Sequence, residues 1–147
     1  MVIHVIYLKA MKHEFYTFTE FKNDFPSDDV CLEHIFKEKY VKSCRCGAGS
    51  FYRVRGRKCY ACSSCARQIY PLKNTIYARS STSLVLWFYA VYLLTETDGM
   101  MSAKDLQREL HVTYKTAWRM KSKIKRVMKR TDADLIKEAR PISFKKY

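Results

Sequence analysis

The sequence predicts a small α+β protein in which N-terminal helices precede a cysteine-rich β-hairpin and an all-helical C-terminal region. Three observations carry this prediction. Five of the six cysteines fall between residues 43 and 70, apolar residues recur at helical spacing on both sides of them, and the basic residues gather in two blocks. We divide the chain accordingly into an N-terminal helical segment at 1–40, a cysteine ribbon at 41–79, a helical region at 80–130 and a polar tail at 131–147.

The first 40 residues predict two short helices that act as a scaffold. Phenylalanines recur at spacings of three, three and four residues and so line one helix face: Phe15, Phe18, Phe21 and Phe25. Pro26 ends this pattern, and Ser27 offers an N-cap for a second helix from about Asp29 to Tyr40. Within that helix we expect Cys31 to pack against apolar neighbours and His34 to be exposed.

The stretch from Ser43 to Tyr70 has the cysteine spacing of a metal site. A Cys-x-Cys pair and a Cys-x-x-Cys pair are separated by the 15 residues 47–61, which suits two zinc knuckles. Zinc prefers four sulfur or nitrogen ligands in a tetrahedron. The expected Zn²⁺ ligands are Cys44, Cys46, Cys62 and Cys65, with Cys59 as the substitute. Reduced cysteines without metal and an iron–sulfur cluster are alternatives, whereas the absence of a secretion signal argues against disulfides.

Between the two cysteine pairs the sequence predicts a β-hairpin. Phe51–Val54 alternates as a strand, Arg55-Gly56 forms the turn, and Arg57–Tyr60 returns. Gln68–Tyr70 supplies a third strand. Four basic residues then gather near the hairpin tip, where they can contact a phosphate backbone: Arg53, Arg55, Arg57 and Lys58. The alternative role for any one of them is solubilising charge.

Residues 80 to 130 predict helices in the order of a helix-turn-helix. An apolar helix follows a cap at residues 81–82 and runs to about Leu94. Ser102 caps a short helix, and Thr113 caps a long one from Tyr114 to about Arg130. On these last two helices the residues expected to face inward are Ala103, Leu106, Leu110, Ala117, Met120, Ile124, Val127 and Met128. In a helix-turn-helix the last helix enters the major groove of DNA.

The charge distribution indicates a polyanionic partner. The net charge is +14, and residues 41–79 and 114–130 carry nine and eight basic residues without any Asp or Glu. Two blocks of one sign favour double-stranded DNA, with two solvated basic faces as the alternative. The candidate DNA-contacting residues on the last helix are Tyr114, Lys115, Thr116, Arg119 and Lys123. We expect Trp118 to pack inward.

Enzyme chemistry and membrane insertion are not predicted. The sequence contains no glycine-rich phosphate loop, no Gly-x-Ser-x-Gly elbow and no His-Glu-x-x-His, and its four histidines stand apart. The longest apolar run, Leu84–Leu94, is eleven residues, whereas about 20 are needed to span a membrane. We therefore expect a non-enzymatic cytoplasmic protein, associated with the nucleoid if the source is a prokaryote.

Several of these residues together resemble insertion-sequence transposases of the ISXO-two-like group, which carry an N-terminal zinc ribbon. The likeness runs from about Thr17 to Arg130, and its most specific part is Tyr-Lys-Thr-Ala-Trp-Arg-Met at residues 114–120. Other matching motifs are Cys46-Gly47, Tyr60-x-Cys62-x-x-Cys65, Trp87-Phe88 and Leu106-x-x-Glu109-Leu110. The resemblance implies that the ribbon and the helix-turn-helix recognise the terminal inverted repeats of a transposon.

The chain departs from this family in three ways, the first of which is Asn74-Thr75-Ile76-Tyr77 where the family tends to have Gly-Thr-Ile-Phe. Ser43 stands where the first knuckle of the family has its first cysteine, so Cys44 must substitute from a shifted position. In the family a ribonuclease-H-like domain that cuts and joins DNA follows this region, and the 17 residues after Arg130 are too few to form one. We therefore expect a DNA-binding module without strand-transfer activity of its own. The alternatives are one piece of a split transposase, whose catalytic domain is encoded separately, and a ribbon-type interaction or regulatory remnant without specific DNA binding.

Overall fold

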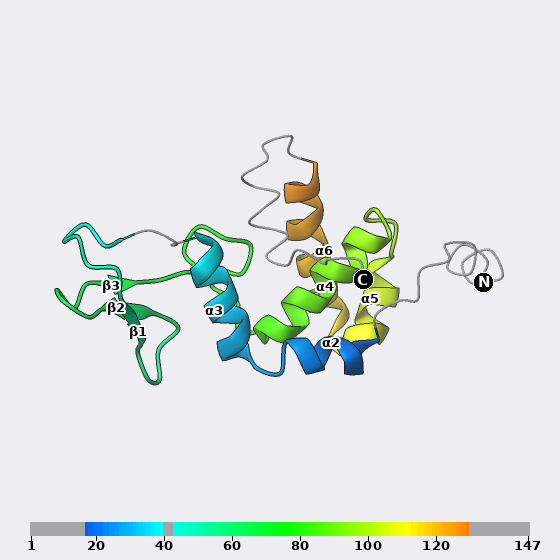
Figure 1. Ribbon diagram of the computed structural model, residues 1–147. Helices are drawn as coiled ribbons and strands as arrows, with labels where there is room; N and C mark the ends of the chain where they lie inside the picture. Colours follow the sequence, from blue (N-terminus) through cyan, green and yellow to red (C-terminus); the bar gives the residue numbers. More distant parts are fainter. Residues whose placement is uncertain (1–16, 40–42, 130–147) are drawn as a thin grey trace.

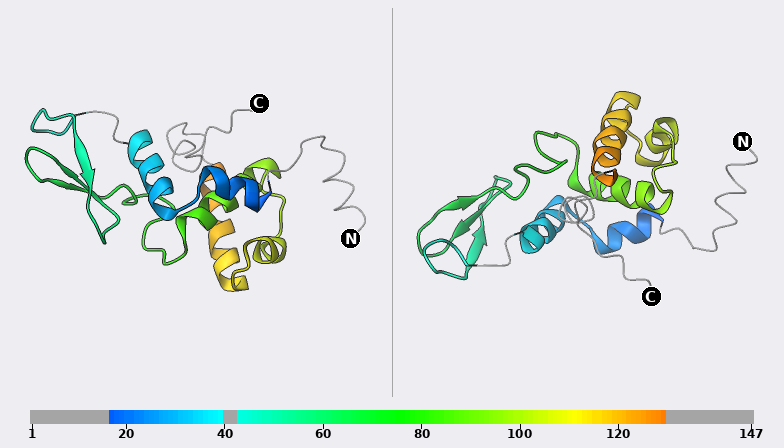
Figure 2. Two further views of the ribbon diagram at one scale, coloured as in Figure 1. Left: turned by 60° about the horizontal axis from the view of Figure 1, so that its bottom comes forward. Right: turned by 90° about the horizontal axis from the view of Figure 1, so that it is seen from above.

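A three-stranded antiparallel sheet stands at one end of a group of helices in the computed structural model, which describes residues 17–39 and 43–129 (Figure 1). The elements in chain order are α2 (Phe18–Asp24), α3 (Asp28–Lys39), β1 (Phe51–Arg53), β2 (Tyr60–Cys62), β3 (Gln68–Ile69), α4 (Leu84–Glu96), α5 (Ala103–Leu110) and α6 (Tyr114–Met128). Seen from a second direction, α3 still lies between the sheet and the other helices (Figure 2). The predicted α+β class is confirmed. Expectations for residues 1–16, 40–42 and 130–147 lie outside the described residues.

Helix α2 begins with a capping box. The side chain of Thr17 accepts a hydrogen bond from the Glu20 N–H at 3.3 Å, and the Glu20 carboxylate accepts one from the Thr17 N–H at 2.8 Å. Helix α3 begins at Asp28, one residue before its predicted start, and buries Cys31 as predicted. In α2, the Thr17–Glu20 capping box satisfies two backbone N–H groups locally, so this short helix needs no cap from a distant part of the chain.

His34 on α3 is not exposed, contrary to the sequence prediction. Its ring lies edge-on between Phe25 and Phe88, with centroids 6.0 and 6.1 Å away. The Nε2 atom is buried and has no hydrogen-bond partner within the described part of the chain. The prediction was wrong because α3 packs against α4, which covers a face of α3 that its own polar residues did not reveal.

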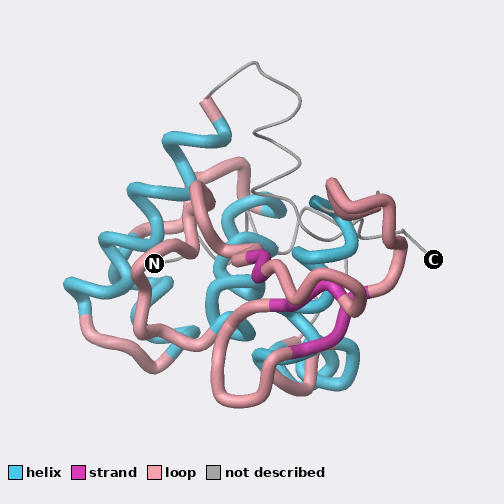
Figure 3. Tube along the Cα trace, turned by 90° about the vertical axis from the view of Figure 1, so that its left-hand side faces the viewer, coloured by secondary structure: helices cyan, strands magenta, loops and turns pink. Residues whose placement is uncertain are grey.

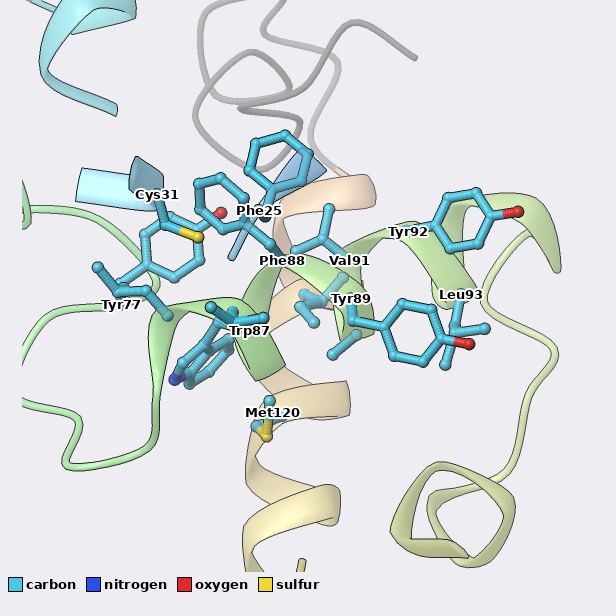
Figure 4. Packing of buried hydrophobic residues seen from close by; sticks show 14 of the residues in the cluster. Phe25, Cys31, Tyr77, Trp87, Phe88, Tyr89, Val91, Tyr92, Leu93 and Met120 are labelled. Carbon is cyan, nitrogen blue, oxygen red and sulfur yellow. The ribbon is translucent and has the colours of Figure 1, made fainter. Parts of the chain in front are cut away.

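Helix α4 is the centre of the hydrophobic core. Ten of its residues are buried: Leu84, Val85, Trp87, Phe88, Tyr89, Ala90, Val91, Tyr92, Leu93 and Leu94. Side chains from α3, from the loop before α3, from the segment before α4 and from α6 converge on it, as Cys31, Phe25, Tyr77 and Met120 show in Figure 4. A helix that is apolar all round is stable only when it is covered on every side. Among the described helices, none combines the length and the apolar character that crossing a membrane requires.

The N-terminus of α4 is capped from another part of the chain. The N-cap position is Ser83, directly after the predicted cap at 81–82, and the Ser83 side chain does not cap the helix. Instead, the Asp28 carboxylate accepts hydrogen bonds from the Ser83 hydroxyl at 2.6 Å and from the Val85 N–H at 3.2 Å. The negative charge also suits the positive end of the α4 dipole. Asp28 thereby ties the start of α3 to the start of α4.

The last two helices follow the sequence prediction closely. The Ser102 hydroxyl accepts from the Asp105 N–H at 3.1 Å at the start of α5, and the Thr113 hydroxyl accepts from the Thr116 N–H at 3.3 Å at the start of α6. His111 ends α5 with a φ of 52°. Seven of the eight predicted inward residues are buried and the eighth is partly buried: Ala103, Leu106, Leu110, Ala117, Met120, Ile124 and Val127, with Met128 at the edge.

The sheet has the strand order β1-β2-β3 and packs on α3. Arg53 pairs with Tyr60 in the first ladder, and Tyr60 pairs with Ile69 in the second. The predicted second strand at 57–60 begins too early, because the turn extends through residues 55–58 and β2 starts only at Tyr60. The Phe36 ring of α3 stacks on Tyr60 at 4.1 Å between centroids. Figure 3, which faces the sheet, shows how little of this region is strand and how much is loop.

Candidate metal centre and nucleic-acid interface

Four cysteine side chains converge beside the end of β2. The Sγ atoms of Cys44, Cys46, Cys62 and Cys65 all lie within 4.8 Å of one another. The Cys44–Cys65 and Cys46–Cys62 sulfurs are each 3.6 Å apart. A disulfide requires about 2.05 Å, whereas thiolates around a tetrahedral zinc at ~2.3 Å lie about 3.8 Å from one another. The four free thiols therefore fit a single tetrahedral metal ion.

Two similar turns present these thiols. In the first, the Gly47 N–H donates to the Cys44 carbonyl at 2.8 Å, and in the second the Ala66 N–H donates to the Cys62 carbonyl at 3.0 Å. Gly47 and Ala66 each follow the second cysteine of their pair, and both have positive φ, at 86° and 55°. Glycine adopts this conformation without strain, whereas alanine does so at a cost. The sulfurs of the shorter Cys-x-Cys pair thus meet those of the longer pair, with Cys44 rather than residue 43 supplying the first of the four thiols, as expected.

Electrostatics within the cluster favour a bound cation. Backbone N–H groups of Cys65 and Ser64 lower the pKa of the Cys62 thiol to about 6. The backbone N–H of Ala48 favours the thiolate of Cys46, yet the neighbouring sulfurs of Cys65 and Cys62 outweigh it and raise the pKa of Cys46 to about 11. Without a metal, Cys62 thus loses its proton readily, whereas Cys46 keeps its proton in hydrogen bonds to the neighbouring sulfurs. A bound metal ion would replace these hydrogen bonds, because it holds its coordinated thiols deprotonated.

The other two cysteines lie apart from the cluster. Cys59, the predicted substitute ligand, is fully buried in the turn before β2, and its carbonyl accepts the Val54 N–H at 3.1 Å. Cys31 is fully buried in α3, and burial raises the pKa of its thiol to about 12. A thiol with so high a pKa is a poor ligand and a poor nucleophile, so Cys31 contributes to packing.

The four basic residues of the hairpin divide into two pairs. The Arg53 guanidinium lies 2.9 Å from the Asp29 carboxylate and also donates to two backbone carbonyls of the turn. The Lys58 ammonium lies 3.8 Å from the Asp28 carboxylate. Both residues therefore attach the sheet to the N-terminus of α3. The two that are exposed and have no ion-pair partner among the described residues are Arg55 and Arg57.

Helix α6 exposes a basic face opposite its buried stripe. Residues 114–129 contain seven Lys or Arg and no Asp or Glu. The predicted DNA-contacting residues that are exposed there are Tyr114, Lys115 and Arg119, whereas Thr116 is half-buried. Lys123 points inward: its ammonium donates to the Ile76 carbonyl at 3.2 Å and lies 5.8 Å from the centre of the Trp87 ring. Burial lowers the pKa of Lys123, so this residue belongs to the packing between α6 and α4.

The prediction that Trp118 packs inward is wrong. Its side chain is 57% exposed, and that of Tyr114, one turn earlier on the same face, is 54% exposed. Trp87 on α4 is the tryptophan that fills the core, at 0% exposure. The helical period could have indicated this, because position 118 is not three or four residues from Ala117, Met120 or Ile124.

Comparison with other proteins adds no information on function, since no family model, curated protein or solved structure matches the chain. The arguments for a function therefore come from two features of the molecule. One is the cluster of four thiols, which can hold a metal ion. The other is the exposed face of α6, which combines cations with two aromatic rings.

Proposed function

We propose that this chain is a zinc-dependent DNA-binding module of the transposase type, which recognises the terminal inverted repeats of a transposon. The observation that carries the proposal is the exposed face of α6, whose charged residues are all basic, since residues 114–129 contain no acid. Helices α5 and α6 are joined by a short turn at residues 111–113. This order is that of a helix-turn-helix, in which the second helix lies in the major groove.

The positions along α6 suggest a division of labour. Exposed Tyr114, Lys115 and Arg119 lie near the N-terminal end of α6, where a recognition helix meets base edges. Arg126 and Lys129 are exposed near the other end, where contacts to phosphates supply affinity without reading sequence. An arginine at position 119 suits bidentate bonding to guanine O6 and N7.

The metal would have a structural role in this function. Four protein thiols complete a tetrahedron and leave no open position for a substrate, so the zinc site is of the closed type. The sheet that it stabilises carries the exposed pair Arg55 and Arg57, which can contact the phosphate backbone beside the site read by α6. If the chain is instead one piece of a split transposase, the alternative interpretation, strand transfer would belong to a separately encoded catalytic domain.

A binding titration tests the proposal. The metal-loaded protein is titrated with a duplex that carries the inverted repeat flanking its gene, and separately with a scrambled duplex of equal length. Both titrations are made at two salt concentrations. We expect a preference of ~10³-fold or more for the repeat, the lower range for specific DNA-binding proteins. Equal binding to both duplexes would contradict the proposal and favour the interaction or regulatory remnant.

Two arginine variants on α6 sharpen the titration. Arg119→Ala should weaken binding to the repeat by about 10- to 100-fold and leave binding to the scrambled duplex nearly unchanged, because a base contact is lost. Arg126→Ala is the matched control on the same helix. It should weaken binding to both duplexes alike and reduce the salt slope by about one, because a phosphate contact is lost. Equal behaviour of the two variants would argue against base reading by α6.

A further inference from the structure

We propose that Trp118, together with Tyr114, forms an apolar reading surface for the methyl groups of thymine in the major groove. This inference rests on the proposed DNA-binding function and names a sequence preference for it. Trp118 and Tyr114 are 57% and 54% exposed, so both rings are available to a partner at the surface.

The two rings are placed together rather than scattered. The large hydrophobic residues that are exposed within the described parts of the chain are Tyr52, Tyr70, Met100, Tyr114 and Trp118. A single exposed apolar residue needs no explanation. Trp118 and Tyr114, however, lie four residues apart on one helix and so share a face. Side chains on a helix also tilt toward its N-terminus, which brings the indole over the turn that begins with Tyr114.

The charge around the rings selects the partner. Lys115 and Arg119 lie beside them, and residues 114–129 carry seven cations and no acid. A second copy of this chain would bring the same positive face into contact with itself, and like charges at such close range are repulsive. A nucleic acid is the complementary partner for an aromatic pair set in a cationic face.

The chemistry of the major groove then selects the group that is read. Apart from the hydrogen-bonding edges of the bases, the apolar group offered there is the C5-methyl of thymine. An indole ring in the N-terminal half of a recognition helix can cover such a methyl and exclude water from it. Arg119 on the next position can bond to a guanine at the same time. The pair of side chains would thus favour a thymine beside a guanine.

Replacing thymine with uracil in the DNA is the direct test, because it removes only the methyl group. Single uracil substitutions are made along the inverted-repeat duplex, and affinity is measured for the wild type and for Trp118→Ala. We expect the wild type to lose about fourfold at one or two positions, as burial of one methyl-sized group predicts. Trp118→Ala should bind the unmodified repeat more weakly and show no further loss at those positions. Trp118→Phe, which keeps a ring, should retain most of the sensitivity.

Fluorescence supplies a second readout that does not depend on affinity. Trp87 is 0% exposed and Trp118 is 57% exposed, so iodide should quench mainly Trp118 in the free protein. Adding the repeat duplex should protect Trp118 from iodide, and the Trp118→Phe variant, which retains only Trp87, should show no such change. Tyr52→Ala is the matched control, since it removes an exposed ring on the sheet and should leave the uracil sensitivity unchanged.

The possible failures can be told apart. If the wild type prefers the repeat but neither uracil nor Trp118→Ala changes its affinity, the thymine inference is overturned and the proposed function stands. If the wild type does not prefer the repeat at all, the proposed function fails, and iodide protection of Trp118 will be absent or equal with both duplexes. Protection that grows with protein concentration without DNA would show that the face binds a second copy, which also overturns the inference.

Discussion

The sheet and the helices are held together by different means. The sheet has strands of only three, three and two residues, and β1 and β3 are exposed or half-buried. In the sheet and its connecting loops, three of the buried residues are cysteines: Cys44, Cys59 and Cys62. The helices instead surround α4, which buries ten residues of its own. Fewer than forty residues rarely fold alone without a cross-link or a metal, so the sheet is expected to need the thiol cluster and the helices are not.

The two regions nevertheless meet along α3, which contacts the sheet near its start and again at Phe36. Phe36 stacks on Tyr60 of the sheet at 4.1 Å. Asp28 caps α4 and lies 3.8 Å from Lys58 of the sheet. From this difference we expect a metal ion held by the thiol cluster to fix the shape of the sheet, whereas the contacts of α3 hold the sheet against the other helices.

The largest effect is expected from removing the metal. A strong chelator should unfold the sheet and leave the helices folded, because metal-binding energy is folding energy in so small a unit. Hydrogen–deuterium exchange checks this: backbone amides at residues 43–70 should lose protection, and those of α4 and α6 should keep it. Full protection of residues 43–70 after chelation would refute the assignment of a structural metal.

Two cysteine variants provide the matched comparison for metal removal. Cys62→Ser should release the metal and reproduce the effect of the chelator, since Cys62 belongs to the cluster. Cys59→Ala alters an equally buried thiol of the same region that lies outside the cluster, and it should retain one metal ion per chain. Mass spectrometry under native conditions measures the stoichiometry. Retention of the metal by Cys62→Ser would show that the ligand set is different.

Sequence reasoning identified what depends on local spacing. The four clustered cysteines follow from their spacing, and the buried stripes of α5 and α6 follow from apolar residues three and four apart. Both caps at Ser102 and Thr113 were predicted as well, because a capping side chain bonds to a backbone N–H only three residues away. In each case the residues that come together are either close in the chain, as in the caps, or of one type, as in the cysteine cluster.

What sequence reasoning missed depends on contacts between distant segments. Asp28 caps α4 from 57 residues away, measured to Val85. Lys123, one of the expected DNA-contacting residues, bonds to a carbonyl 47 residues earlier, at Ile76. His34 is covered by Phe88, which nothing in the sequence of α3 indicates. Such partners become visible only when the helices are placed against one another.

An intermediate effect is expected from Asp28→Ala. This change removes the cap of α4 and should destabilise the helices by about 1 kcal/mol, the usual contribution of a helix cap. Denaturant unfolding followed by circular dichroism at 222 nm measures the loss. Asp29→Ala is the neighbouring control: its carboxylate is 75% exposed and pairs with Arg53, so its removal should cost less. A larger effect of Asp29→Ala would contradict the capping role of Asp28.

The smallest effect is expected from the protonation of His34. Burial lowers the pKa of His34 below its usual value of 6.5, and Lys37 adds to this, while Glu38 acts in the opposite direction. As the pH falls, His34 therefore binds a proton at a higher pH in the unfolded chain than in the folded chain. Stability from this residue should be fully present above pH 6.5, should fall as the pH decreases through the folded pKa, and should then level off.

The variant His34→Phe isolates this contribution. It keeps a ring between Phe25 and Phe88 and removes both the titrating group and the buried Nε2 atom that lacks a partner among the described residues. Because both proteins carry the same thiol cluster, the acid sensitivity of the metal cancels in the difference between their unfolding free energies. That difference should grow in favour of the variant as the pH falls below 6.5. A difference that is constant between pH 7.5 and pH 5 would mean that His34 titrates alike in the folded and unfolded chains, and that α4 does not desolvate it.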